Sequence, residues 1–568
     1  MKHIYIVLIA ILLIGCSKKG GLDSTDLDEL TDEKVFSDAN NTRKALQNLY
    51  GSMREVTNSN SGSFSRHFDI NVAVAMLDNA TDDGAGNTTR NAGTVPGIQK
   101  YINGAISATS NPVVGTHPWQ FFYEAIRNAN VFLANVEKSP LSADEKQASM
   151  NQARFLRAYF HHELFRWFGP LVISKEPGDP FAFDKTKRED LKTSVDFLVS
   201  EFDALSKPGM LPEKWDLSEY GKITRSAAMA YKVRTLVYAA SPLFQASGST
   251  WKQAADAAAE LITYAESNGL HSLYYSPSDR EKSYSRYFNE RYNPENILVY
   301  LRANTNDLYN LFPAFNPWNI NKELTTVPTQ WLIDSYDMLN GTEPIIGYNA
   351  DNSPIINPAS GYNEQDPYKN RDPRFAQTIL YHGASWPLVN KAKVTVDIRT
   401  PNNWGSGYFL VKWLDDRIDH RSAGTTSQNF IMMRFAEVLL NFAEAANEAS
   451  NDAVSRQKAI DQLNKIRERA GITVPLKASD YTQNTLRARI QKERRVELCF
   501  EEHRFFDIRR WKIATQVMNR PAIGITIEAG KFVRRPLDVR SYSERMNLSP
   551  LPVAEVNNAP LIYQNPGY

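Results

Sequence analysis

The chain has 568 residues, of which 42% are hydrophobic, 65 are Lys or Arg and 64 are Asp or Glu. A formal net charge of +1 excludes a protein that attracts nucleic acid through a generally basic surface. The only two cysteines, Cys16 and Cys499, exclude a disulfide framework, and the length allows about two to four domains.

The first predicted element is a short leader. An apolar run, residues 4–14, follows Lys2 and His3 and ends in Leu-Ile-Gly before Cys16. It is shorter than the roughly 20 residues of a membrane span but fits the apolar part of a secretory signal. The sequence around Cys16 resembles the bacterial lipoprotein signal, in which the chain is cut before the cysteine and the cysteine is acylated. The alternative is a short uncleaved anchor.

These observations give a domain prediction. Residues 1–15 form a lipoprotein signal peptide, residues 16–40 a tether that begins at the lipidated Cys16, and residues 41–568 a single body. Two or more acyl chains anchor a protein stably, whereas one chain holds it only marginally.

Helical periodicity dominates the remaining elements. Residues 152–168 place apolar side chains at four-residue steps, and Gly169-Pro170 ends that helix. Residues 226–240 are apolar on nearly every face, which predicts deep burial, and the Ala-rich residues 251–267 allow a neighbouring helix to approach closely. Further helices are expected at 429–450, 453–470 and 485–512, with Gly471 in a C-terminal capping position.

The helices are expected to pair across short connections, 225–246 with 251–267 and 430–449 with 453–470, as in helical-repeat packing. No fixed sequence period accompanies them, so a plain repeat array is excluded. Residues 79–118, 274–331 and 341–407 are predicted to be long loops. The second of these is richer in aromatic residues than the chain average of 11%, which argues against disorder.

Several runs resemble the SusD/RagB nutrient-binding outer-membrane lipoproteins of Bacteroidetes. The carriers of the resemblance are NFIMMRFAEVLLNFAEAANE (429–448), LNKIRERAG (463–471), IQKERRVELCFEEHRFFDIRRW (490–511), LSPLPVAEVNNAPLIYQNPGY (548–568), RDPRF (371–375), and residues 119–133, 153–169 and 224–241. They occur in the family's order and cover the chain from about residue 22 to its end. One departure is PLVI after Phe168-Gly169, where members commonly carry a second Gly and Val-Pro-Leu.

The resemblance implies a mainly α fold: tetratricopeptide-like helix pairs that form one compact body with long ligand-binding loops and little β-structure. It implies a SusD-like N-terminal segment at about 22–240 and a SusD/RagB segment at about 275–568. Members are held in the outer membrane by a lipid anchor and face the cell surface. They capture oligosaccharides, or sometimes peptides, for a SusC-like TonB-dependent transporter. The resemblance therefore implies no catalysis. We expect no cofactor and no metal among the site residues, a structural calcium being left open, and the balanced charge predicts no nucleic-acid partner.

The charged motifs allow a competing enzymatic interpretation. Arg434, Glu437, Asn441, Glu444 and Glu448 share one helix face, and two carboxylates on such a face can serve a glycosidase. Because the same helix also carries apolar residues on its other faces, we expect these groups to be paired charges that fix helix register. The same interpretation applies to the charged residues of the later motif: Glu493, Arg494, Arg495, Glu497, Arg504, Asp507, Arg509 and Arg510.

Two other polar patterns fall short of a known site. His162-Glu163 lacks the second histidine of a zinc-protease motif, because position 166 is Arg. We expect His161 and His162 to be packing or helix-surface residues. Residues Asp78, Asp82 and Asp83 lack the glycine and glutamate of a calcium-binding EF-hand, and they are predicted to be polar loop residues that can face a ligand.

The ligand site is predicted from the stretch NDLYNLFPAFNPWNIN, residues 306–321, in which aromatic residues alternate with asparagines. A sugar ring packs against an aromatic face, and amides satisfy its hydroxyl groups. The predicted stacking and hydrogen-bonding residues are Trp318, Tyr309, Phe315, Asn316 and Asn319, completed by Asn87 and Arg90 from the N-terminal loop. The alternative is that the rings pin the loop to the body. Trp331 is expected in the core. Trp386 and Trp404 are expected on loops and are assigned neither to the core nor to the ligand site.

Three functions therefore compete: an oligosaccharide-binding module, which includes a peptide-binding variant, an all-α surface glycosidase, and a helical scaffold that binds only protein. The first predicts binding without turnover, the second product release, and the third no sugar affinity.

Overall fold

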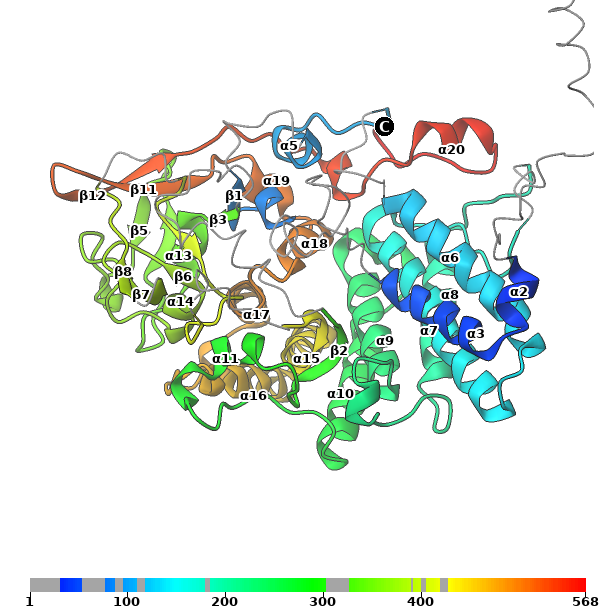
Figure 1. The fold of residues 1–568 in the computed structure, drawn as a ribbon. Helices are drawn as coiled ribbons and strands as arrows, with labels where there is room; N and C mark the ends of the chain where they lie inside the picture. The colour runs from blue at the N-terminus through cyan, green and yellow to red at the C-terminus, as the bar shows by residue number, and fades with distance from the viewer. Residues whose placement is uncertain are drawn as a thin grey trace, which may run out of the picture.

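The computed structural model describes residues 31–53, 77–86, 96–109, 118–178, 184–302, 326–389, 392–399, 405–418 and 428–568. Helices dominate this part of the chain (Figure 1). Their bounds are α2 Asp32–Phe36, α3 Ala39–Gly51, α5 Pro96–Asn103, α6 Pro118–Asn135, α7 Ala143–Phe168, α8 Leu191–Leu205, α9 Arg225–Ala240, α10 Trp251–Ser267, α11 Ser283–Asn289, α13 Gln330–Ser335, α14 Pro373–Thr378, α15 Phe435–Ala449, α16 Ala453–Arg469, α17 Gln483–Glu497, α18 His503–Arg510, α19 Ala514–Met518 and α20 Val553–Asn558.

The helices pack side by side around one core. α6 packs on α7, α9 on α8 and α10, and α15 on both α10 and α16. The buried apolar residues of these helices belong to one hydrophobic cluster that reaches from Phe36 to Ile562. Helix α9 is buried along nearly its whole length, and the alanines of α10 face the core, as the sequence predicts.

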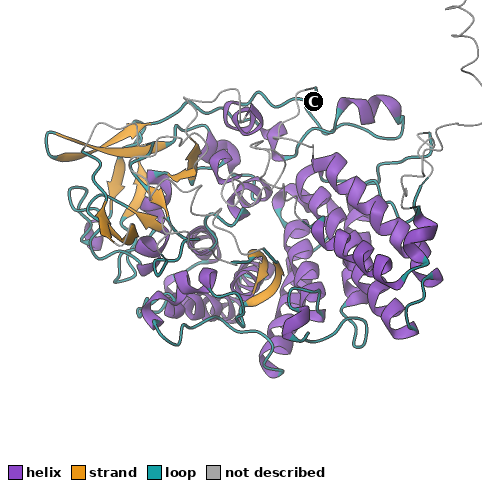
Figure 2. Cartoon of the chain, viewed as in Figure 1, coloured by secondary structure: helices purple, strands orange, loops and turns teal. Residues whose placement is uncertain are grey.

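The strands are short and pair two by two, and in Figure 2 most of them gather at one end of the molecule. Every pair among the described strands is antiparallel: β1 with β3, β2 with β10, β4 with β5, β6 with β9, β7 with β8 and β11 with β12. Their bounds are β1 Gly84–Gly86, β2 Asn296–Tyr300, β3 Thr326–Pro328, β4 Ile345–Tyr348, β5 Pro354–Ile356, β6 Ile379–Leu380, β7 Ser385–Val389, β8 Ala392–Thr395, β9 Phe409–Leu410, β10 Phe430–Arg434, β11 Ile523–Glu528 and β12 Lys531–Pro536. The predicted mainly helical fold with helix pairs and little β-structure is confirmed.

Two predicted helices are divided differently in the structure. The helix expected from residue 429 begins only at Phe435, because residues 430–434 form β10 and pair with β2. The helix expected over 485–512 ends at Glu497, and a second helix begins at His503. Between them Phe500 and Glu502 adopt left-handed backbone angles, φ 57° and 66°, which break the helical path.

Part of the aromatic stretch is packed core instead of loop. Residues 283–289 form α11 and residues 296–300 form β2, and Tyr284, Tyr287 and Phe288 of α11 are buried. These rings pack α11 into the core, whereas the rings of residues 306–321 lie outside the described residues. The buried Trp331 of α13 confirms its predicted core position, and Trp386 of β7 is buried too.

The described body begins inside the range predicted as a tether. α2 buries Phe36, whose ring packs edge-on against Phe132 of α6 at a centroid distance of 5.8 Å. Residues from α2 onward therefore belong to the packed body, and the predicted tether is confined to residues before α2.

The C-terminal segment is fastened to the end of α7. Gly169 ends α7 with φ 79°, and the buried Arg188 donates hydrogen bonds to the carbonyl oxygens of Phe168 and Pro170. The same guanidinium donates to Asn565 Oδ1 at 2.8 Å. N-terminal and C-terminal sequence segments thus pack into the same body.

Candidate functional site

The predicted ligand-binding residues lie outside the described residues. Trp318, Tyr309, Phe315, Asn316 and Asn319 fall in segment 303–325, Asn87 and Arg90 fall in segment 87–95, and Cys16 and Trp404 are also outside. The structure does describe the residues from which these two segments start and end. We call the described residues that flank each segment its roots, and these roots define the candidate site.

Strand pairing brings the roots of the two segments together. In β1–β3 the register is Gly84 with Pro328, Ala85 with Val327, and Gly86 with Thr326. Gly86 is the last described residue before segment 87–95, and Thr326 is the first after segment 303–325. Residues separated by well over two hundred positions thus place one end of each segment at the same point of the fold.

The turn before β1 is held by arginines from α17, α18 and the C-terminal region. Arg504 donates two hydrogen bonds of 2.8 Å to the carboxylate of Asp82. Arg495 bonds Asp83 at 2.5 Å and makes an ion pair of 3.0 Å with Asp82. Arg540 donates to the carbonyl oxygen of Gly84 at 2.8 Å. The two strands are also tied at Thr329, whose backbone N–H donates to the Asp83 carbonyl at 2.9 Å.

Asp82 and Asp83 lie in a turn, as predicted for loop residues, but all three aspartates are buried, so the prediction that they can face a ligand is wrong. Asp78, Asp82 and Asp83 are at most 2% exposed. Burial disfavours ionisation of Asp82, but Arg495 and Arg504 outweigh it and lower the pKa of that carboxyl. Burial and the neighbouring Asp83 instead raise the pKa of Asp78 well above its usual range. The turn is thus a structural clamp at the root of segment 87–95.

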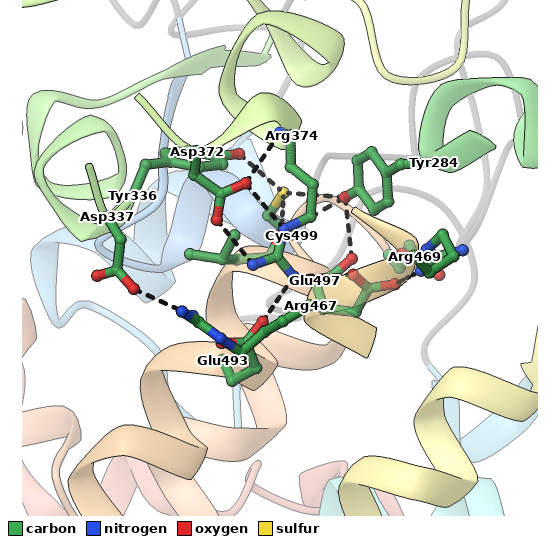
Figure 3. Close-up of polar contacts among 12 residues, drawn as sticks. Tyr284, Tyr336, Asp337, Asp372, Arg374, Arg467, Arg469, Glu493, Glu497 and Cys499 are labelled. Carbon is green, nitrogen blue, oxygen red and sulfur yellow. Dashed lines mark hydrogen bonds and ion pairs between the residues drawn. The ribbon is translucent and has the colours of Figure 1, made fainter. Parts of the chain in front are cut away.

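The family motif at residues 490–511 also carries a buried ionic network, which is shown in Figure 3. Glu497 of α17 is fully buried and accepts from Arg434 at 2.8 Å, from Arg374 at 3.0 Å and from Arg469. Arg374 also pairs with Glu493 at 2.7 Å. These contacts join α17 to α14, α16 and the β10–α15 junction. Such a network holds several elements in one register.

The structural interpretation of the other motif charges is also confirmed. Glu437 pairs with Arg234 of α9, with a 2.7 Å bond from Nε, and Glu444 pairs with Arg510 of α18 at 2.6 Å. Both carboxylates are buried. Glu448 pairs with Arg487 near the surface, at 2.7 Å from Nε. The face of α15 that carries these residues therefore contacts protein.

The histidines and the free thiol are packing groups. His161 and His162 are fully buried, so neither lies on the helix surface, and burial lowers the pKa of His161 to about 3. Cys499 is buried in the turn after α17, with the hydroxyl of Tyr336 at 3.6 Å from its sulfur (Figure 3). Burial raises the pKa of the Cys499 thiol, which makes it unreactive.

One described cavity gathers acid and base side chains. It has a volume of about 40 Å³ and is lined by Glu163, Arg166, Glu501 and His503, among others. A space of this size holds a water molecule or two but no sugar ring. Glu163 is bonded to Arg166, and Glu501 to Arg434 at 2.8 Å. These carboxylates are engaged in ion pairs and do not line an open cleft.

Two further properties concern the described ranges alone. Within them, no three His, Cys, Asp or Glu side chains are grouped in a way that could hold a metal ion. Within the same ranges, no helix combines the length and the apolar character that a membrane crossing requires.

The fold and its clamped roots define a class of protein: a helical body in which buried ion pairs position the ends of long inter-element segments. Comparison with known sequences gives the family. A profile of the SusD family matches residues 272–568, and one described as "Starch-binding associating with outer membrane" matches residues 26–237. The chain belongs to the SusD family, as the sequence motifs predict.

Individual relatives agree with this assignment. SusD-like protein P2 of Formosa agariphila is 25% identical over the full length of both chains. A solved SusD-like protein from Bacteroides fragilis superposes with a TM-score of 0.76 at 25% identity and covers 95% of this chain and 99% of its own. Surface glycan-binding protein A from Bacteroides fluxus has the same fold, with a TM-score of 0.60, 19% identity, and coverage of 94% and 100%.

Proposed function

We propose that this protein is a cell-surface lipoprotein that captures oligosaccharide and delivers it to a TonB-dependent outer-membrane transporter without cutting it. The observation that carries the proposal is the β1–β3 register, which brings an end of segment 87–95 beside an end of segment 303–325. The predicted site draws its residues from these two segments: Trp318, Tyr309, Phe315, Asn316 and Asn319 from one, and Asn87 and Arg90 from the other.

The comparisons support the ligand class and the location. One matching profile describes starch binding and association with the outer membrane, and one neighbour of the same fold is a surface glycan-binding protein. A lipid on Cys16 would supply the membrane attachment, after removal of residues 1–15. Delivery of the ligand to a SusC-like transporter in the outer membrane explains why a binding protein is attached to that membrane.

The carboxylates that suggested a glycosidase lie where they cannot act on a sugar. Glu437, Glu444, Glu493 and Glu497 are buried and paired with arginines. A glycosidase needs two carboxyl groups facing each other across a cleft that admits the sugar. Their burial supports binding without hydrolysis.

A glycan array combined with a hydrolysis assay tests the proposal. We expect the purified protein to bind one group of oligosaccharides and to release no product from them over hours. Turnover of a bound glycan would contradict the proposal in favour of a glycosidase. Binding to peptides but to no glycan would make the protein a peptide-capturing member of the family.

The anchor is tested separately in the native host. We expect the mature protein to begin at an acylated Cys16 by mass spectrometry and to fractionate with the outer membrane. Cys16→Ala should release it from that membrane. An unacylated mature N-terminus in the wild-type protein would contradict the anchor without affecting the glycan result.

A further inference from the structure

A larger cavity lies away from the β1–β3 pair. Its volume is about 580 Å³, and its lining comes from three stretches: residues 213–224 between α8 and α9, residues 269–271 after α10, and residues 292–299 around the start of β2. Cavities of roughly 300–1,000 Å³ are the usual size of small-molecule sites. None of its lining residues belongs to the predicted ligand site.

Aromatic side chains form one wall of this cavity. Tyr292 is 53% exposed, although a large aromatic side chain gains free energy by burial. Its ring contacts that of Tyr220 edge-on, with the two ring centroids 4.8 Å apart. Trp215 is partly buried and fixed by a 2.9 Å hydrogen bond from its Nε1 to the carbonyl oxygen of Ile223. An exposed, supported ring is the group that packs against the C–H face of a sugar.

The aromatic wall is held rigidly before any ligand arrives. Asn296 donates a 2.8 Å hydrogen bond to the Tyr220 hydroxyl, and its own amide oxygen accepts from Tyr287 at 2.8 Å. Tyr287 is buried in α11. A preorganised wall reduces the entropy lost on binding.

Polar groups beside the rings suit a neutral ligand with many hydroxyl groups. Asp216 makes no capping hydrogen bond to the helical turn that follows it. Lys222, whose Nζ lies 5.2 Å from the Trp215 ring centroid, is ion-paired with Glu219. The charged lining consists of Glu213, Lys214, Asp216 and Lys222, so the two signs balance. Burial lowers the pKa of His271 to about 4, which leaves a neutral imidazole at pH 7.

We propose that this cavity is a second oligosaccharide-binding site, in which a sugar ring stacks on Tyr292 and hydroxyl groups bond to Tyr220 and Asp216. The inference rests on the proposed function for its ligand class, and on the cavity itself for its position. A second site would let one protein hold a long chain at two points, which raises the effective affinity by keeping the free end close.

Fluorine NMR of the full-length protein labelled with 5-fluorotryptophan tests the proposal. The chain has 10 tryptophans, and the variants Trp215→Phe and Trp318→Phe assign the resonance at each site. Maltohexaose, laminarihexaose, cellohexaose and xylohexaose are titrated in turn. We expect at least one to shift the Trp215 resonance saturably. Tyr292→Ala should weaken that response about tenfold or more, as the loss of a stacking partner does.

Tyr563→Ala is the matched control, because Tyr563 has a similar exposure of 49% and lies in the C-terminal segment. It should titrate like the wild type. Tyr563→Ala removes a hydrogen bond from the Tyr563 hydroxyl to the Glu189 carbonyl oxygen, so the control for folding is that both variants unfold in one cooperative transition above the titration temperature. Shifts confined to Trp318, with Tyr292→Ala unchanged, would overturn the second site and leave the proposed function standing. If no hexasaccharide moved the Trp215 resonance, the second site would be overturned, while the glycan array decides the proposed function independently.

Discussion

Arg504 and Asp82, 422 positions apart in the chain, form a buried bidentate ion pair with two hydrogen bonds of 2.8 Å. Arg504 belongs to α18, and Asp82 lies in the turn that leads into β1. The pair fixes the root of segment 87–95 to the helical body. Charged residues of the longest family motif thus hold the described residues from which segment 87–95 starts.

Replacing Asp82 should loosen that root. Asp82→Asn leaves Arg504 without its buried counter-charge and leaves Arg495 with Asp83 alone, and breaking a buried pair in this way costs about 3–5 kcal/mol. We expect that loss in urea unfolding. We also expect faster hydrogen exchange at the amide of Thr329, which donates to the Asp83 carbonyl across the strand pair.

The neighbouring Asp78 provides the matched control for this change. It is equally buried, but its raised pKa favours the neutral acid, which an asparagine resembles in shape and charge. Asp78→Asn should therefore lose far less stability than Asp82→Asn. Equal losses from the two variants would show that the ion pairs do not fix the turn.

A second prediction concerns the centre of the ionic network. Glu497→Gln removes the charge that faces Arg374, Arg434 and Arg469, and it should reduce the free energy of unfolding by about 3–5 kcal/mol. Glu448→Gln, which affects only a partly exposed pair with Arg487, should cost about 1 kcal/mol or less. Calorimetry and urea titration measure both. Similar small effects would refute a structural role for the buried network.

Stability should fall in acid over a defined pH window. Arginines outweigh burial and lower the pKa of Glu437 and Glu493 from 4.5 to about 2. Burial lowers the pKa of His503 from 6.5 to about 4. Because each folded pKa lies below the unfolded one, the unfolded state binds more protons in acid. The raised pKa values of Asp78, Asp83 and Glu555 oppose this trend, but the buried carboxyls with a lowered pKa outnumber them: Asp82, Asp337, Glu437, Glu493, Glu497, Glu501 and Asp507.

We therefore expect the melting temperature to decline from pH 6.5 downward, as His503 favours unfolding, and more steeply between pH 4.5 and pH 2, as the glutamates do. Differential scanning calorimetry at constant ionic strength measures the profile. In Glu437→Gln the steeper part should flatten. A melting temperature that stays constant down to pH 3 would contradict the assigned shifts.

The predicted ligand residues give a further test. Trp318→Ala should weaken binding of the array-identified glycan by about 1–3 kcal/mol, the contribution of one stacking contact. Isothermal titration calorimetry measures the loss, with Tyr563→Ala as an exposed aromatic control. Unchanged affinity in Trp318→Ala would place the principal site outside segment 303–325.

Local sequence pattern was sufficient for the long helices. The four-residue apolar steps of α7 and the alanines of α10 predict buried helices, because the helix period is a short-range property, but they do not show that α7 is buried on nearly every face from Asn151 to Phe168. Pattern failed at residues 430–434, where an apolar run continues into α15. Those residues form β10 because a distant strand, β2, offers hydrogen-bond partners, and a periodicity cannot reveal that pairing.

The sequence by itself determined the family, the helical class and the kinds of side chain available for a ligand. It did not determine which charges are exposed. The sequence predicts that Asp82 and Asp83 can face a ligand, whereas the structure buries both in ion pairs with Arg495 and Arg504. Nor did it reveal the cavity around Tyr292, whose walls come from three separate stretches. Burial, ion pairing and concavity depend on which distant segments meet, and only the tertiary structure sets those distances.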